Sequence, residues 1–346
     1  FTSFRPIFKQ NFITISYNYT NRNYNRFIVT SSVKHQTEKL KLSFDAFLEN
    51  DNKNAPLSLN LSKEDEQILA NAGNNEDLMF APSAVVTEYD VNKILYKLVQ
   101  NPQGNYYEFS TDKAETLYNV SFTYFGGGKG DYKLKQSTNN GRVFEFVGAG
   151  NGDYSALRKL PSPQKSQVFS TSAEYTFNKG KIGGDFSLSN YDVNLFSSKN
   201  NDQNTGFAGR IFGNKIFTKN NWQGTVGAEF QRISSQFHIL DRINDVEFSR
   251  DFNLTQEFNQ ITQNRLIFSF LNSWKNTNFI NYKLNYLNEK QSYNGLKNDL
   301  DFKFLKKKTE TRGNLSYLNT TSDFQDTQFA IGNIATEILG KKGSWS

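Results

Sequence analysis

The sequence predicts an all-β protein, a transmembrane antiparallel β-barrel with a non-barrel insertion that contains a short helix. Three observations carry this prediction. Segments of about ten residues alternate apolar and polar side chains. Short and long connections follow one another in turn. The composition is polar, with only 36% hydrophobic residues, yet 15% of the 346 residues are aromatic. A soluble β-sandwich shares the composition, but it has no reason to place all its short turns at one end.

The N-terminal region, residues 1–48, is predicted to supply the first barrel strands. Three strand-like segments cover Phe12–Thr20, Tyr24–Lys34 and Lys39–Leu48, with short turns between them. In the third, apolar and polar residues alternate, so one face suits lipid and the other suits water.

Residues 49–117 are predicted to form an insertion at one mouth of the barrel or in its lumen. Ser62 has the character of a helix N-cap, with acidic residues in the following turn. The helix is expected to run through Leu69 and to stop at Gly73. The apolar residues within Ile94–Val99 indicate either a second short helix or a buried strand.

Residues 118–167 are predicted to form a glycine-rich hairpin pair. The segment Gly126–Tyr132 matches Gly148–Tyr154 at an offset of 22 residues, and Asn140-Gly141 between them is a strong hairpin signal. The aspartates of the two copies, Asp131 and Asp153, are weak calcium candidates, because each copy offers only one carboxylate. Bends between strands are the favoured interpretation, so no metal site is expected.

Residues 168–346 show the clearest barrel pattern. The strands are predicted at Val168–Phe177, Lys181–Tyr191, Gly206–Phe217, Trp222–Ile233, Thr262–Asn272, Asn278–Glu289, Leu296–Leu305 and Glu310–Thr320. Tight turns join them in pairs, and longer loops such as Asp192–Thr205 and Ser234–Ile261 join one pair to the next. This alternation matches short periplasmic turns and long extracellular loops. About fourteen strands are expected in all.

The loop Ser234–Ile261 is unusually apolar. Its residues Phe237, Ile239, Leu240, Phe248 and Phe252 are candidates for contact with a partner protein. The alternative, strand extension with internal packing, explains the same residues and is favoured.

Little in the sequence indicates catalysis. There is no cysteine, which excludes thiolate nucleophiles and disulfides. Only two histidines are present, His35 and His238, and neither is paired by sequence with a serine or aspartate. The net charge of +6 is interspersed and builds no basic face, so nucleic acid is not an expected partner. We expect no enzyme activity and no cofactor.

Several segments resemble large outer-membrane proteins of Bacteroidota, and the Asn- and Lys-rich usage resembles that of flavobacteria. The segments are Phe47–Pro82, the paired glycine-Asp-Tyr motifs, Leu160–Lys165 and Leu188–Ser198. The role of that family is mostly unassigned. The resemblance implies a location in the cell outer membrane, with the lipid bilayer and other outer-membrane or surface proteins as partners.

The expected function is that of a structural or accessory subunit of an outer-membrane assembly or secretion complex. The chain begins at Phe1 without a leader and is interpreted as a mature fragment of a larger protein. A transport pore or channel for solutes or polymers is the alternative, and polar inward faces would support it. A membrane-embedded hydrolase is a third reading, which the histidine count argues against.

Overall fold

The computed structural model describes residues 25–53, 61–102, 104–254, 261–275, 277–290, 292–339 and 344–345. The fold is all-β, with antiparallel sheets, and the described residues contain two α-helices. Two compact units are present. We call Asp51–Gln164 with Val193–Lys199 the insertion unit, and Arg26–Asn50, Lys165–Asp192 and Asn200–Ser346 the sheet unit.

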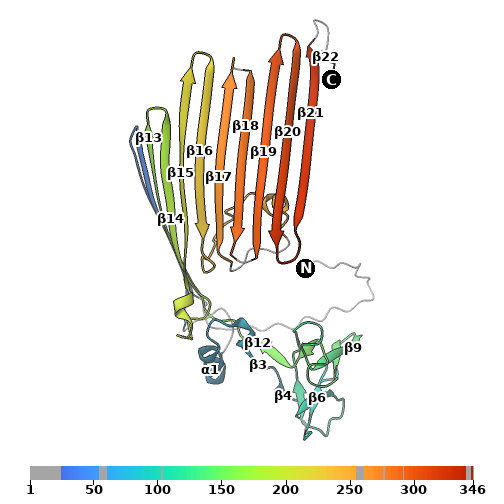
Figure 1. The fold of residues 1–346 in the computed structure, drawn as a ribbon. Coiled ribbons are helices and arrows are strands. Elements are labelled where there is room, and N and C mark those ends of the chain that lie inside the picture. Colours follow the sequence, from blue (N-terminus) through green and yellow to red (C-terminus); the bar gives the residue numbers. More distant parts are fainter. Residues whose placement is uncertain are drawn as a thin grey trace. The chain divides into compact units, whose positions relative to one another are not determined.

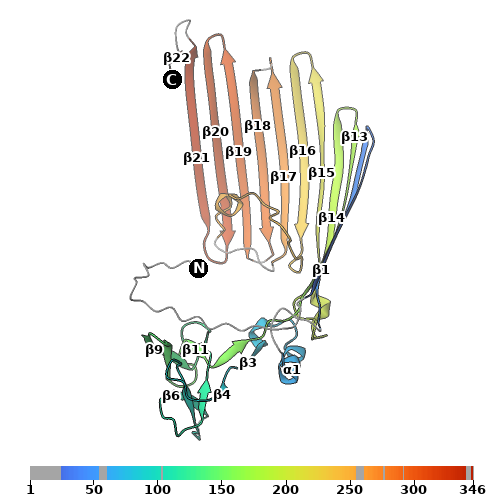
Figure 2. The same ribbon diagram turned by 180° about the vertical axis from the view of Figure 1, so that it is seen from behind.

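The sheet unit consists of one twelve-stranded antiparallel sheet in which the strands follow chain order (Figures 1 and 2). The strands are β1 (Arg26–Gln36), β2 (Leu40–Asp51), β13 (Lys165–Phe177), β14 (Gly180–Asp192), β15 (Thr205–Lys219), β16 (Trp222–Ile233), β17 (Gln263–Trp274), β18 (Asn278–Glu289), β19 (Tyr293–Lys306), β20 (Thr309–Ser322), β21 (Thr327–Leu339) and β22 (Ser344–Trp345). All eight strands predicted within 168–320 are confirmed, most with ends shifted by one to three residues.

Within the described residues the sheet is open and no closed barrel is found, a point that the sequence leaves undecided. Its order begins at β1 and ends at β22, and no pairing joins these two strands within the described residues. Closure requires the first and last strands to pair. The hairpin pattern of the sequence carries no information on that pairing, because it specifies neighbouring strands only. The strand predicted at Phe12–Thr20 lies outside the described residues.

The tight turns lie where the sequence predicts them, whereas, apart from the insertion, only two of the connections at the opposite end are long. Tight turns gather at one end of the sheet, at the top of Figure 1. Four of them place a non-glycine residue at positive φ, namely Lys179, Asn220, Lys275 and Lys307. Positive φ matches the right-handed twist of the flanking strands, which explains why these hairpins stay short. The opposite end carries the longer loops at 193–204 and 234–262 and two short links at 290–292 and 323–326.

The insertion unit contains α1 (Lys63–Ala72), with the boundaries that its sequence predicts. Ser62 accepts a hydrogen bond from the Asp65 backbone, Asp65 accepts one in return from the Ser62 backbone, and Gly73 ends the helix. Arg158 forms a two-pronged ion pair with the same Asp65, at 2.7 and 2.8 Å. The helix buries Leu69 in a small core with Ala72, Met79, Ala81 and Leu160. None of the helices within the described ranges is long and apolar enough to cross a membrane.

Three small sheets complete the insertion unit. Their strands, in spatial order, are β4 (Val85–Thr87), β7 (Leu117–Asn119), β5 (Tyr96–Val99) and β6 (Tyr106–Phe109); β10 (Gly141–Phe146), β9 (Tyr132–Thr138), β11 (Tyr154–Ser155) and β8 (Thr123–Tyr124); and β12 (Leu157–Lys159) with β3 (Phe80–Pro82). Of the segment Ile94–Val99, residues Tyr96–Val99 form a strand and none form a helix. Two short 3-10 turns cover Glu76–Leu78 and Asn201–Gln203.

Candidate functional site

The twelve-stranded sheet has one apolar and one charged face. Residues opposite each other on antiparallel strands share a face. One such row runs from Val226 through Phe270, Tyr282 and Leu300 to Leu315, across five strands. Val226, Phe270 and Leu315 remain 47%, 42% and 41% exposed. Among the described residues of the sheet unit, these side chains stay exposed, which is unusual for apolar groups of this size.

Aromatic side chains border the apolar face at the end with the tight turns. Trp222 lies opposite Trp274, and Trp274 packs on Phe304 with ring centroids 5.7 Å apart. From Phe304 back to Leu296 there are eight residue steps along β19, a span of about 26 Å at ~3.3 Å per residue. That height is close to the ~25 Å apolar band of outer-membrane barrels, which aromatic girdles also border.

A polar row borders the apolar face at the other end. The amide of Asn264 donates to Asn288 at 3.2 Å, and that of Asn288 donates to Asn294 at 2.8 Å. Further along, Asn190 donates to Thr205 at 3.1 Å. The apolar band therefore stops at a line of side chains that bond one another along the rim.

The charged face carries ion pairs that cross from strand to strand. Arg210 contacts Asp185 at 2.6 Å and Glu229 at 4.0 Å, which links β14, β15 and β16. Glu174 contacts both Lys41 and Lys181, at 3.3 and 2.8 Å. Such pairs are partly exposed and each adds little to stability. They show that this face is built for water or polar groups.

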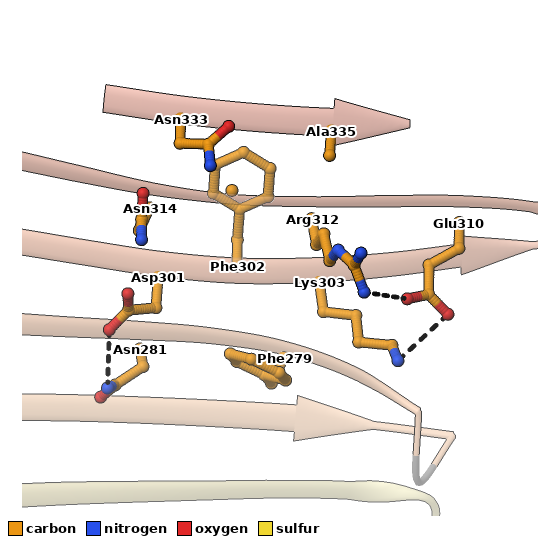
Figure 3. Close-up of a pocket in the computed structure, with 11 residues that line it drawn as sticks. Phe279, Asn281, Asp301, Phe302, Lys303, Glu310, Arg312, Asn314, Asn333 and Ala335 are labelled. Atoms are coloured by element: carbon orange, nitrogen blue, oxygen red, sulfur yellow. Dashed lines mark hydrogen bonds and ion pairs between the residues drawn. The ribbon is translucent and has the colours of Figure 1, made fainter. Parts of the chain in front are cut away.

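One hollow on the charged face lies over β18 to β21 near the tight turns and has a volume of about 630 Å³ (Figure 3). Figure 3 shows Lys303 and Arg312 pointing toward Glu310, at 3.0 and 4.0 Å. Asn281 donates to Asp301 at 3.4 Å on the other side. The charges of this hollow are matched among themselves, so no ligand charge is specified.

The long loop after β16 folds back onto the charged face. We call Ser234–Leu254 the inward loop; it contains α2 (Phe248–Asp251) and lies near the end with longer connections (Figures 1 and 2). Phe248 and Phe252 are buried against Leu287, Tyr293 and Leu318. These five residues form a small apolar island on a charged face, which explains why this loop is so apolar in sequence.

Polar contacts anchor the same loop. The Tyr293 hydroxyl donates to the Phe252 carbonyl at 2.6 Å, and Lys297 contacts Asp251 at 2.8 Å. Asn253 donates to Thr327 at 3.1 Å. These contacts tie the inward loop to β19 and β21.

The five residues predicted to contact a partner do not form one surface. Phe248 and Phe252 are only 6% and 2% exposed, so they belong to the interior of the sheet unit. Ile239 and Leu240 are 44% and 46% exposed, and with Phe237 they line a hollow beneath the loop. The hydrophobicity of the sequence could not separate these two groups, because both are apolar at similar spacing.

This second hollow, the loop pocket, has a volume of about 510 Å³. Its floor is the charged face of β13 to β17, including Asp185, Arg210, Glu229 and Arg265, and its roof is residues 237–244 of the inward loop. Sequence reasoning missed these charged residues as a group. The available signal was the alternation of these residues within each strand. It places them on one face of the sheet but does not show that the inward loop lies over them.

His238 is a structural part of the roof. Its ring stacks on Tyr191 with centroids 3.8 Å apart, and its backbone N–H donates to the Ser189 hydroxyl at 2.9 Å. Burial lowers the pKa of the His238 imidazole, so the ring is neutral at pH 7. His35, the other histidine, lies exposed on β1.

The two glycine-rich copies, Gly126–Tyr132 and Gly148–Tyr154, cross each other in a pseudo-symmetric arrangement that we call the clasp. Gly130 and Gly152 exchange two backbone hydrogen bonds of 2.9 and 2.7 Å. Asp131 accepts from the Gly150 N–H at 3.1 Å, and Asp153 accepts from the Gly128 N–H at 3.3 Å. Each aspartate thus holds the turn of the opposite copy. Within the described ranges, no group of three His, Asp or Glu residues could hold a metal ion.

The crossing explains why the motif requires glycine. A Cβ atom on Gly130 would lie 2.4 Å from the Tyr154 backbone, and one on Gly152 would lie 2.3 Å from that of Tyr132. Gly128 and Gly150 adopt φ of 70° and 71°, which favours glycine. The repeat is therefore explained by backbone packing without a ligand.

No protein-family model matches the chain, and no curated protein is significantly similar to it.

Proposed function

We infer that the sheet unit is part of the wall of an outer-membrane β-barrel and that the chain acts as a structural or accessory subunit of an outer-membrane assembly. The observation that carries this proposal is the apolar face, with its aromatic border at one end and its asparagine row at the other. A face of this kind fits lipid, with both borders at the headgroup level.

Energetics favour a membrane over water for this face. Apolar surface stabilises a protein by about 25 cal/mol per Å² when it leaves water. More than twenty large apolar side chains in the sheet remain over a third exposed in the isolated chain, among them Phe186, Ile211 and Phe268. Lipid would cover them without any change in the strands.

The open edges favour an assembly. Among the described residues, β1 is exposed along its whole length, and β22 pairs with Ile338 and Leu339 alone on the outer edge of β21. In lipid every backbone N–H and C=O must be bonded. In a membrane, strands beyond the described residues, from this chain or from another, would therefore cover both edges.

A fluorescence experiment tests the orientation of the two faces. In a background without tryptophan (Trp222→Phe, Trp274→Phe, Trp345→Phe), a single tryptophan is introduced either as Tyr282→Trp or as Lys283→Trp. These neighbours on β18 lie on the apolar and the charged face, respectively. In vesicles, lipids brominated on the acyl chain should quench the first strongly and the second weakly. Equal quenching of both, or a chain that stays monomeric without detergent, would overturn the proposal.

A transport pore is the second candidate, and the ion-paired charged face with its inward loop favours it. In this case the charged face lines a water-filled lumen. Conductance steps in planar bilayers that increase when residues 235–254 are deleted would support transport. If neither the wild type nor the deletion variant shows conductance steps, the transport function is contradicted and the structural role remains.

A further inference from the structure

We propose that the loop pocket binds a small zwitterion with an apolar side chain, namely an apolar amino acid or a short peptide. This inference goes beyond the proposed function, because it depends only on the charged face and the inward loop. The pocket combines an available cation, nearby carboxylates and exposed apolar groups in about 510 Å³. Ligand sites of proteins typically fall in this size range and combine apolar walls with few polar groups.

Arg265 supplies the cation. Its Nε donates to Asn285 at 3.1 Å, and its guanidinium lies 5.0 Å from the centre of the Phe248 ring. Within the described residues no carboxylate lies within ion-pair distance of it. Arg210, in contrast, is held by Asp185 and Glu229. An arginine fixed by stacking and by one bond, with its remaining N–H groups unpaired, is suited to a ligand carboxylate.

Glu229 and Asp241 supply the negative side of the pocket. Glu229 lies on the floor and is 4.0 Å from Arg210, a long contact that neutralises it only in part. Asp241 lines the pocket from the loop side, and its carboxylate accepts a hydrogen bond from the neighbouring Arg242 backbone at 2.7 Å, which leaves lone pairs for a further donor. An ammonium group between them would be matched, whereas a second carboxylate would be repelled. The pocket therefore fits a zwitterion better than a dianion.

The roof supplies the apolar contact. Ile239, Leu240 and Ile243 line the pocket and are 44%, 46% and 42% exposed. Elsewhere on this loop, Phe248 and Phe252 are fully packed. A ligand with an apolar side chain would cover the three exposed residues, which accounts for apolar groups over a charged floor.

Calorimetry with four peptides tests the proposal on the full chain folded in detergent micelles. Leu-Leu should bind, while Leu-Leu-amide, N-acetyl-Leu-Leu and Gly-Gly should each bind about tenfold more weakly or worse, because each lacks one of the three matched groups. Titration into empty micelles gives the partition background. This comparison uses the unaltered protein, so it does not depend on how a variant folds.

Substitution of Arg265 locates the site. Arg265→Gln should weaken Leu-Leu binding about tenfold and leave the weak binding of Leu-Leu-amide unchanged. Arg232→Gln is the matched control, since Arg232 lies beside the Gln231–Arg265 pair but on the opposite face of the sheet, where it bonds Asn264. No heat from Leu-Leu above background, or equal affinity for all four peptides, would overturn the proposal. Absence of peptide binding would not change the lipid-quenching result, so the ligand site and the membrane wall are tested separately.

Discussion

The two units use aromatic residues in opposite ways. In the insertion unit they point inward: Tyr96 and Tyr132 are 1% and 4% exposed, and Phe122 packs between them with ring centroids at 5.1 and 4.8 Å. In the sheet unit aromatics such as Phe268 and Trp222 point outward and are 45% and 56% exposed. The same aromatic richness thus builds a water-excluding core in one unit and a lipid-compatible surface in the other. Composition alone cannot distinguish these uses; residue spacing within strands does.

The strongest expected contrast is alkaline unfolding of the insertion unit. Burial raises the pKa of Tyr96 to about 12 and that of Tyr132 to about 12. Their stabilisation is present below pH ~10, the pKa of an unfolded tyrosine, and is lost as pH rises through 12. Together the two raised pKa values correspond to roughly 5 kcal/mol of stability that is lost at high pH. Tyrosinate absorbance followed with near-ultraviolet circular dichroism measures it.

Tyr96→Phe is the control for this titration. It removes one of the two buried hydroxyls and should halve the loss of stability between pH 10 and 12, although the Phe144 N–H loses its 3.0 Å acceptor. An unchanged loss in this variant would contradict the assignment.

Truncation of Phe252 tests whether the sheet unit has an interior of its own on the charged face. Phe252→Ala should weaken docking of the inward loop by about 3–5 kcal/mol, because Phe252 fills the island formed with Leu287 and Tyr293. Hydrogen exchange at the Leu254 amide, which bonds the Ser249 carbonyl, reports this docking. Ile239→Ala, at a half-exposed position, should change it by less than about 1 kcal/mol. Equal effects of Phe252→Ala and Ile239→Ala on this exchange would contradict the burial of Phe252 under the inward loop.

A charge on the apolar face tests the outward use of aromatics. Phe268→Arg should destabilise the sheet by about 2–4 kcal/mol in vesicles, as expected near the bilayer midplane. Ser269→Arg, one residue away and on the charged face, is the natural comparison, although its side chain sits close to Gly227. Urea unfolding from vesicles gives both values. A larger cost for the second variant would place the lipid on the other face.

Substitution within the clasp tests the inward packing of the insertion unit at its tightest point. Gly152→Ala should cost about 1–3 kcal/mol, because the new Cβ would meet the Tyr132 backbone at 2.3 Å. Gly127→Ala is the control, since no atom lies within 4 Å of its Cβ position. Thermal unfolding of the two variants should differ clearly, and similar midpoints would count against the crossing.

The smallest expected effect is that of the clasp aspartates. Asp153→Asn keeps an acceptor for the Gly128 N–H but removes the charge, and should cost about 1 kcal/mol. Added calcium should not change the melting temperature of either protein. A calcium-dependent rise in the wild type alone would restore the metal interpretation of Asp131 and Asp153.

Local features were predictable from the sequence, and long-range ones were not. The bounds of α1 follow from Ser62 and Gly73, and the strand bounds of β16 and β18 match their alternation, because these signals act over a few residues. Strand β21 was not delimited in advance. Ala330 and Gly332 interrupt its apolar face, while Phe329 and Ile331 lie on the other, so its alternation is weak.

The missed features all depend on contacts between distant segments. Asn194 donates to the carbonyls of Leu69 and Gly73 at 2.7 and 2.8 Å, so a segment after β14 completes the end of α1. The loop pocket joins Arg265 to residues near 240 in the same way.

The crossing of the clasp limits how this sequence can change during evolution. Each copy of the 22-residue repeat supplies the aspartate that the other copy's turn needs, so neither half is self-sufficient. If one copy were lost, the other copy would lose the aspartate that holds its turn. A third copy would have no copy left to pair with. The β9–β10 hairpin between the copies, in contrast, is secured at its base by the exchange at Gly130 and Gly152. Its tip at Asn139-Asn140 is thus the place where this unit can lengthen, diversify or accept a grafted segment while its frame persists.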